Sequence, residues 1–251
     1  MQWGQDPAGA LAVADAPLGT PESFAQIEAH RLREQPWMRE TFKFDRYEGR
    51  RVLEIGVGLG TDHLQFARAG AKMTGIDLTP SCVALTWQRV LQEGLRSDLR
   101  VMDAETLEFP DHSFDAVYSF GVLHHVPSMD RALREVRRVL RPGGRFVGGL
   151  YSRNSFFWTR WLLRKQLSPE LRRMPMDEYR AQIEHSESGA IPYVRLLSRR
   201  ELARLLWGAG FADVSIVSRH AGLGRFTERV PARIERTLGR VGGWYLIHDA
   251  T

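Results

Sequence analysis

The strongest chemical signal in the chain is a glycine-rich run between a short apolar stretch and an amphipathic one. It reads Glu54-Ile55-Gly56-Val57-Gly58-Leu59-Gly60. Glycines in a turn between a strand and a helix let the backbone approach a ligand closely, and the amino terminus of the helix supplies unpaired N–H groups. Position 61 is threonine, so the third glycine comes one residue earlier than in the G-x-G-x-x-G fingerprint of dinucleotide binding. This spacing disfavours a nicotinamide cofactor. The glycines could also be present only because a tight turn requires them sterically.

Two acidic positions follow the glycine run at the ends of the next two apolar runs. Asp77, with Leu78 beside it, lies 17 residues after Gly60, where a carboxylate can accept hydrogen bonds from both hydroxyls of a ribose. Asp103-Ala104-Glu105 places another acid where the exocyclic amine of adenine would lie. Asp103 could instead be the N-cap of the short turn that follows. The order of glycines, acid and acid nevertheless predicts an adenosine pocket.

Apolar runs alternate with amphipathic stretches from Arg51 onward, which is typical of a parallel sheet covered on both faces. Helices are expected from Thr61, a possible cap, to Gly70, and from Thr79-Pro80 to about Gly94. A third helix is indicated by apolar residues at three- and four-residue steps, and it should end at the glycines after Pro142. Its stripe is Met129, Ala132, Leu133, Val136, Val139 and Leu140. Ser198 and Glu201 form a possible capping box for a fourth helix.

Seven apolar runs are expected to be strands. They are residues 51–56, 71–77, 98–102, 114–120, 145–151, 211–218 and 243–250. The predicted fold class is therefore α/β: a Rossmann-like, doubly wound, mostly parallel seven-stranded sheet with helices on both faces.

The sequence between about Trp37 and Tyr151 resembles the class I S-adenosylmethionine-dependent methyltransferases, in particular the bacterial small-molecule branch related to the ubiquinone and menaquinone methyltransferases. The matching text is VLEIGVGLGTDHLQFARAGAKMTGIDLTP, DAETLEFPDHSFDAVYSFGVLHHV and ALREVRRVLRPGGRF. The resemblance implies that Glu54 to Gly60 lie against the methionine part of the cofactor, that Asp77 holds the ribose and that Asp103 meets adenine. Val57 replaces the usual Cys or Ala between the first two glycines, where the family contact is largely made by the backbone.

The predicted strand 114–120 ends in Phe120-Gly121-Val122-Leu123-His124-His125. Related enzymes place here residues that line the cofactor, as expected of Phe120, and sometimes a general base. A neutral imidazole could take a proton from the acceptor as the methyl group moves. If the pair were extended, only one ring would face the methyl group. Both histidines could instead only pack or hydrogen-bond the cofactor, with alignment supplying most of the catalysis.

Two regions fall outside the strand–helix alternation. Residues 1–48 are expected to be a loose leader and a helical lid segment, and residues 49–251 the methyltransferase domain, with a second lid inserted at 152–197. Insertions at the carboxyl ends of strands lie over the ligand crevice of open α/β sheets. The expected acceptor-binding residues are Trp37, Phe42, Trp158, Trp161 and Tyr193, with His185 and Arg195 as weaker candidates. The aromatic and basic helix around Trp158 could also rest on a membrane interface or simply pack on the core.

Composition narrows the class of protein. The chain has 251 residues, 43% of them hydrophobic, which suffices for a large buried core. One cysteine, Cys82, excludes an internal disulfide, and no Cys/His spacing suggests zinc, so a metal-free cytoplasmic protein is expected. The first twenty residues lack the features of a signal peptide, and no apolar run is long enough to span a membrane. The net charge of +5 is spread over helix faces that also carry glutamates, so nucleic-acid binding is not expected.

These observations predict S-adenosylmethionine-dependent methyl transfer to an oxygen or nitrogen of a small-molecule metabolite. Two alternatives stay open at this point: an enzyme that cyclises or rearranges the cofactor or otherwise does not methylate, and a silent cofactor-binding module. The sequence does not indicate the acceptor or the oligomeric state.

Overall fold

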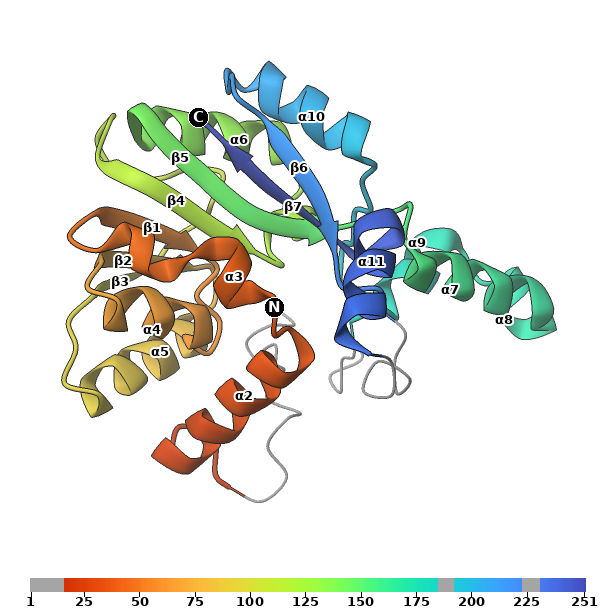
Figure 1. The fold of residues 1–251 in the computed structure, drawn as a ribbon, viewed down its shortest axis with the longest axis horizontal. Coiled ribbons are helices and arrows are strands. Elements are labelled where there is room, and N and C mark those ends of the chain that lie inside the picture. The colour runs from red at the N-terminus through yellow and green to blue at the C-terminus, as the bar shows by residue number, and fades with distance from the viewer. Residues whose placement is uncertain (1–15, 185–191, 223–230) are drawn as a thin grey trace.

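A computed structural model describes residues 16–184, 192–222 and 231–251. They form one seven-stranded sheet in the order β3-β2-β1-β4-β5-β7-β6 (Figure 1). The strands are β1 (Arg51–Ile55), β2 (Lys72–Asp77), β3 (Asp98–Val101), β4 (Phe114–Phe120), β5 (Leu140–Tyr151), β6 (Ser215–Arg219) and β7 (Tyr245–Ala250). Only β7 runs against its neighbours, β5 and β6, and the other pairs are parallel. The mostly parallel seven-stranded sheet is therefore confirmed.

Helices cover both faces of the sheet. On one face lie α4 (Thr61–Arg68) and α5 (Pro80–Gln92), and on the other α6 (Met129–Val139) and α10 (Arg199–Gly208) (Figure 1). The predicted stripe of α6 is buried, from Met129 to Val139, with Leu140 continuing into β5. This stripe packs with Leu202 and Leu206 of α10 over the strands. Burial of one helix face is what the three- and four-residue spacing predicts.

Local signals placed most element boundaries correctly. Thr79 and Pro80 begin α5, Gly70 adopts a positive φ of 84° after α4, and Ser198 with Glu201 forms the expected capping box. Thr61 is not the cap of α4, because Gly60 occupies the N-cap with a φ of 73° and Thr61 is the first helical residue. The last strands were less well predicted, since β6 begins only at Ser215 and α11 (Ala232–Gly242) was not expected.

The two irregular regions are helical. The amino-terminal one contains α2 (Pro21–Glu34), α3 (Met38–Phe42) and the 3₁₀ turn η2 (Phe44–Tyr47). The insertion contains α7 (Phe156–Leu167), α8 (Pro169–Arg173) and α9 (Met176–Ala181), which project from the end of β5 (Figure 1). Within the described ranges, none of the helices has both the length and the apolar character needed to cross a bilayer.

Candidate functional site

The glycine loop between β1 and α4 has the backbone shape that requires glycine. Gly56, Gly58 and Gly60 have φ values of 82°, 52° and 73°. No atom lies within 4 Å of the place that a Cβ at Gly58 would occupy, so the loop faces open space there. At Gly56 the same atom would lie 2.2 Å from Val122, which shows that the loop after β4 packs directly on this turn. The Val57 side chain, between the first two glycines of the loop, is buried.

Asp77 joins the end of β2 to the glycine loop. Its Oδ2 accepts a hydrogen bond from the Gly58 N–H at 3.0 Å, and its Oδ1 accepts one from the Thr79 N–H at 2.9 Å. Burial raises the pKa of this carboxyl, and the backbone hydrogen bonds oppose that rise. A carboxylate oxygen can accept more than one hydrogen bond, so acceptor capacity remains for a ligand hydroxyl.

Glu54 lies under the loop and not on its open side. Its Oε2 is 2.8 Å from His63 Nδ1, and His63 Nε2 is 2.7 Å from the Ser97 hydroxyl. Ser97 donates its proton to the Met73 carbonyl, so the histidine must donate to Ser97 and presents a lone pair to Glu54. Burial, with the nearby carboxylates of Asp62 and Asp77, raises the pKa of Glu54 well above its ordinary value. A protonated Glu54 that donates to a neutral His63 satisfies both groups.

The candidate adenine side follows β2 and β3. Leu78 is 48% exposed, Asp103 is exposed and Ala104 is buried in the main core. Asp103 Oδ1 accepts the Glu105 N–H at 2.8 Å, so the turn-capping interaction is present. Glu105 Oε1 accepts the Ser128 N–H at 2.8 Å, just before α6.

Helix α2 packs over the glycine loop. Phe24 and Ile27 form a small buried cluster with Leu59 of the loop. Arg31 binds Asp62 of α4 through both carboxylate oxygens, at 3.3 and 2.7 Å, and stacks 4.6 Å from the Phe120 ring centroid. Helix α2 therefore covers part of the loop.

Arg89 of α5 supports the loop from below. It is 2% exposed and donates to the Leu59 carbonyl at 3.1 Å, and it also pairs with Glu28 of α2 at 2.6 Å. Buried guanidinium groups need such partners. The sequence interpretation missed Arg31, Arg89 and His63, because their partners lie between 9 and 61 residues away and no local spacing marks them.

The histidine pair lies in the 3₁₀ turn η3 (Leu123–His125) and is not extended. The two ring centroids are 4.1 Å apart, and that of His124 is 3.9 Å from that of Tyr151. His124 is fully buried, and neither of its ring nitrogens has a hydrogen-bond partner among the residues that the structure describes. Burial, and then the neighbouring His125, lower the pKa of His124 well below its ordinary value. The ring is therefore neutral.

His125 contacts the insertion. Its Nδ1 is 2.8 Å from the Tyr193 carbonyl, and its Nε2 is 3.6 Å from Glu184 Oε1. Burial lowers the pKa of His125, while Glu184 and the hydrogen bond to Tyr193 raise it. No sequence signal pointed to Glu184, which lies 59 residues from His125 in the chain.

Aromatic side chains connect the amino-terminal segment to the end of β4. Trp37 lies 6.1 Å from Phe120 and 6.0 Å from Tyr245 between ring centroids. Phe42 is buried in the core, with its ring 5.9 Å from that of Phe120. Phe120 is thus the point where the predicted cofactor and acceptor residues meet.

The predicted aromatic residues of the insertion are in three different environments. Trp158 is buried in a cluster of the insertion that also contains Tyr179 and Trp244. Trp161 packs on the edge of that cluster, and Tyr193 is 51% exposed with its hydroxyl accepting from Arg195. His185 lies outside the described residues.

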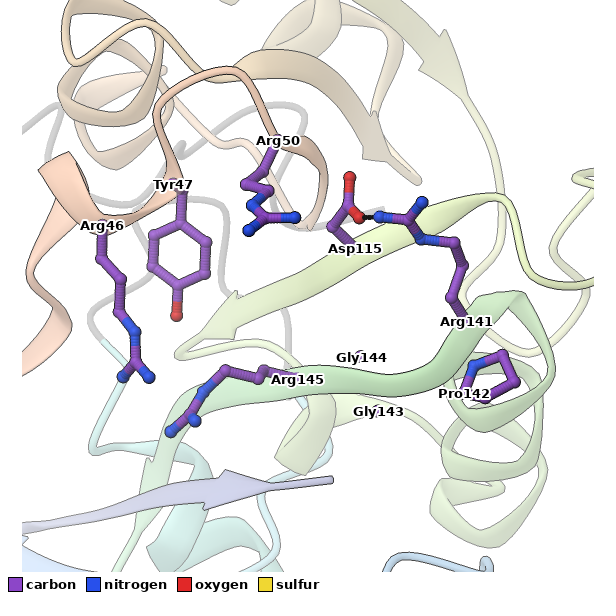
Figure 2. A pocket seen from close by; sticks show the side chains of 9 residues that line it. All are labelled: Arg46, Tyr47, Arg50, Asp115, Arg141, Pro142, Gly143, Gly144 and Arg145. Carbon is purple, nitrogen blue, oxygen red and sulfur yellow. Dashed lines mark ion pairs between the residues drawn. The ribbon is translucent and has the colours of Figure 1, made fainter.

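A cavity of about 480 Å³ lies at the other end of the strands, near the residues where β4 and β5 begin (Figure 2). The Asp115–Arg141 ion pair lines one side of it, and Arg46 and Tyr47 line the other. Open α/β sheets bind their ligands at the carboxyl ends of the strands. This cavity is therefore separate from the candidate site.

Comparison with known proteins places the candidate cofactor site within a segment that matches a known family. The family described as "Methyltransferase domain" matches residues 53–148, which contain the glycine loop, Asp77, Asp103 and the histidine pair. This segment is therefore similar to known methyltransferase domains. The open space at Gly58, the carboxylate of Asp77 and the exposed Asp103 fit an adenosyl group. Solved structures that share this fold include S-adenosylmethionine-dependent methyltransferases.

Curated relatives of the methyltransferase domain act on different atoms. The ubiquinone biosynthesis O-methyltransferase of Paramagnetospirillum magneticum is 35% identical over 130 residues, covering 52% of this chain and 49% of that protein. The fatty-acid O-methyltransferase of Mycolicibacterium smegmatis is 38% identical over 135 residues, covering 53% and 48%. The phosphatidylethanolamine N-methyltransferase of Cereibacter sphaeroides is 40% identical over 101 residues, covering 39% and 49%. Sterol C-methyltransferases are also similar. The chain spans about half or less of the length of these relatives.

Solved structures share the fold over most of the chain. An S-adenosylmethionine-dependent methyltransferase from Mesorhizobium loti has a TM-score of 0.59 at 21% identity, covering 86% of this chain and 96% of that one. The [4+2]-cyclase SpnF has a TM-score of 0.57 at 24% identity, covering 84% and 79%. At these identities the likeness concerns the fold alone.

Proposed function

We propose that the chain transfers a methyl group from S-adenosylmethionine to an oxygen or nitrogen atom of a small-molecule acceptor in the cytoplasm. The observation that carries this proposal is the contact between Val122 and the backbone of Gly56. It brings the turn that holds His124 and His125 against the cofactor loop. The bound cofactor supplies a methyl group activated by its sulfonium charge.

The proposed cofactor-binding residues lie mainly at the carboxyl ends of β1, β2 and β3. The backbone of Gly56, Val57, Gly58 and Gly60 would pass along the methionine part, with Glu54 shaping the loop from below. Asp77 would accept from the ribose hydroxyls while holding Gly58 in place. Leu78 and Asp103 would flank adenine, and Ala104, Glu105 and Phe120 would complete the pocket.

The acceptor would lie between the histidine pair and the two lid segments. A histidine within hydrogen-bond reach of the acceptor would remove its proton as the methyl group arrives, which typically raises a rate by about 10²- to 10⁴-fold. Trp37, Phe42, Trp158, Trp161 and Tyr193 are the proposed acceptor-side residues. The packing of α2 on Leu59 supports a lid role for residues 1–48, and the contact of Tyr193 with His125 supports one for residues 152–197.

The test is turnover with methyl-labelled S-adenosylmethionine and matched acceptors that differ only in a hydroxyl, an amine or neither. We expect one molecule of S-adenosylhomocysteine for each molecule of labelled product, which is a methyl ether from the hydroxyl acceptor or a methylamine from the amine acceptor. Because SpnF shares the fold, isomerised acceptor without S-adenosylhomocysteine would identify a cyclase instead. A thioether such as methylthioadenosine would indicate rearrangement of the cofactor. Tight cofactor binding with no turnover on any acceptor would indicate a silent binding module.

A further inference from the structure

The insertion brings a carboxylate to the histidine pair. One donor atom each from His124, His125 and Glu184 lie within 4.8 Å of one another, a grouping of metal-binding side chains that occurs once in the described ranges. The two histidines come from η3, and Glu184 comes from the turn after α9. Adjacent histidines have no zinc-site spacing by themselves, which is why the sequence indicated no metal.

The tautomer of His125 is set by the insertion. A carbonyl oxygen only accepts, so the 2.8 Å contact between the Tyr193 carbonyl and Nδ1 requires a proton on Nδ1. In the neutral ring, Nε2 then presents its lone pair toward Glu184. Metal-binding histidines are commonly oriented in this way, with the other nitrogen donating to a backbone carbonyl.

Glu184 and His124 both have buried polar atoms without a hydrogen-bond partner among the described residues. Glu184 Oε1 is buried with no hydrogen-bond donor among the described residues, 3.6 Å from His125 Nε2. The fully buried His124 has two ring nitrogens without partners in the same part of the structure. Buried acceptors facing one another are unfavourable unless a proton or a metal cation lies between them.

We propose that His124, His125 and Glu184 bind a divalent transition-metal ion such as Zn²⁺ or Mn²⁺. Nitrogen and oxygen ligands lie about 2.0–2.2 Å from such an ion, so two ligands of a tetrahedral site are roughly 3.4 Å apart. The 3.6 Å between His125 Nε2 and Glu184 Oε1 matches that separation. Two imidazoles with one carboxylate favour transition metals over Mg²⁺ or Ca²⁺, which prefer oxygen ligands.

Three protein ligands leave a coordination position for the acceptor. This consequence rests on the proposed methyl transfer. A coordinated acceptor hydroxyl would lose its proton to water more easily, and its oxygen would then form the bond to the methyl carbon as the carbon–sulfur bond breaks. The metal would then replace the histidines as the means of activating the acceptor and would favour hydroxyl over amine acceptors.

Metal binding can be measured without any acceptor. Full-length protein is stripped with a chelator and titrated with Co²⁺, whose visible absorption reports the ligand set, and with Zn²⁺ in competition with a coloured chelator. We expect one ion per chain. His125→Ala and Glu184→Gln should each weaken binding at least about a hundredfold, because even outer-shell partners change metal affinity by about 10- to 100-fold.

His248→Gln is the matched control. His248 is also buried with neither nitrogen paired in the described structure, but it belongs to no group of metal-binding residues there. It should bind one ion with unchanged affinity, and circular dichroism should show each variant folded. The site is overturned if the wild-type protein binds no stoichiometric ion, or if folded His125→Ala and Glu184→Gln proteins bind it as tightly as wild type. Metal binding without methyl transfer would retain the site and refute the proposed function, whereas methyl transfer unaffected by metal removal would refute the hydroxyl activation.

Discussion

The two halves of the candidate site are built in different ways. The proposed cofactor half consists of backbone turns at the ends of β1 and β2, where Asp77 accepts a hydrogen bond from the Gly58 N–H. The proposed acceptor half is made of side chains from η3, the insertion and the amino-terminal segment that contact one another. A backbone pocket is encoded locally, whereas an acceptor pocket depends on how distant segments pack. The backbone pocket can therefore be predicted from the sequence. The acceptor pocket can differ between proteins that share the fold.

Gly58→Val should break the cofactor half most severely. The added side chain would fill the open space beside the loop, and a β-branched residue is strained at a φ of 52°. We expect calorimetry with S-adenosylhomocysteine to detect no binding while the fold is largely retained.

Gly94→Val controls for the strain in that experiment. Gly94 has a φ of 66° and equally open surroundings, but it lies just after α5. It should lose similar thermal stability and bind the cofactor normally. Normal binding by Gly58→Val would show that the glycine turn is only structural.

Asp77→Ala should weaken cofactor binding by roughly 1.5–3 kcal/mol through loss of charge-assisted hydrogen bonds. The substitution also removes the acceptor of the Gly58 N–H. Asp77→Asn, which keeps the shape and one acceptor oxygen, should therefore lose less. Dissociation constants from titration calorimetry test both, and an unchanged constant in folded Asp77→Ala protein would remove this residue from the pocket.

Glu54→Gln tests whether the carboxyl under the loop is protonated. Burial raises the pKa of Glu54, so the folded protein binds this proton more tightly than the unfolded chain and loses stability as pH rises above the ordinary glutamate value. Glutamine can donate to His63 without a proton to lose. We expect Glu54→Gln to gain thermal stability relative to wild type as pH rises from about 4.5 toward 8. A difference in melting temperature that does not change with pH would contradict a protonated Glu54.

Trp161→Ala should have the smallest effect on the cofactor half. The residue lies on the edge of the insertion cluster, so acceptor KM should rise or kcat should fall while cofactor affinity stays within about threefold, or roughly 0.7 kcal/mol. Trp158 is less suitable for this purpose, because it is buried and its truncation would cost about 3–5 kcal/mol of packing. Equal losses in cofactor and acceptor binding would show that the insertion supports the core and not the acceptor.

Residue patterns predicted the sheet and most helix boundaries because those signals are local. The stripe of α6, the Ser198 capping box and the glycines with positive φ each depend on residues within a few positions. The prediction of secondary structure failed for elements whose position depends on pairing with a segment distant in the sequence. The helix α11 and the late start of β6 belong to the antiparallel edge, where β7 pairs with both β5 and β6.

The sequence by itself determined the strand–turn–helix order, the glycine loop and the acids that follow it, since backbone conformation and hydrophobic spacing are encoded by neighbouring residues. Only the tertiary structure turned Glu54 toward His63, placed α2 over the loop through Arg31 and brought Glu184 to His125. These contacts join segments from 9 to 59 residues apart, and burial in the folded core decides which polar groups become partners.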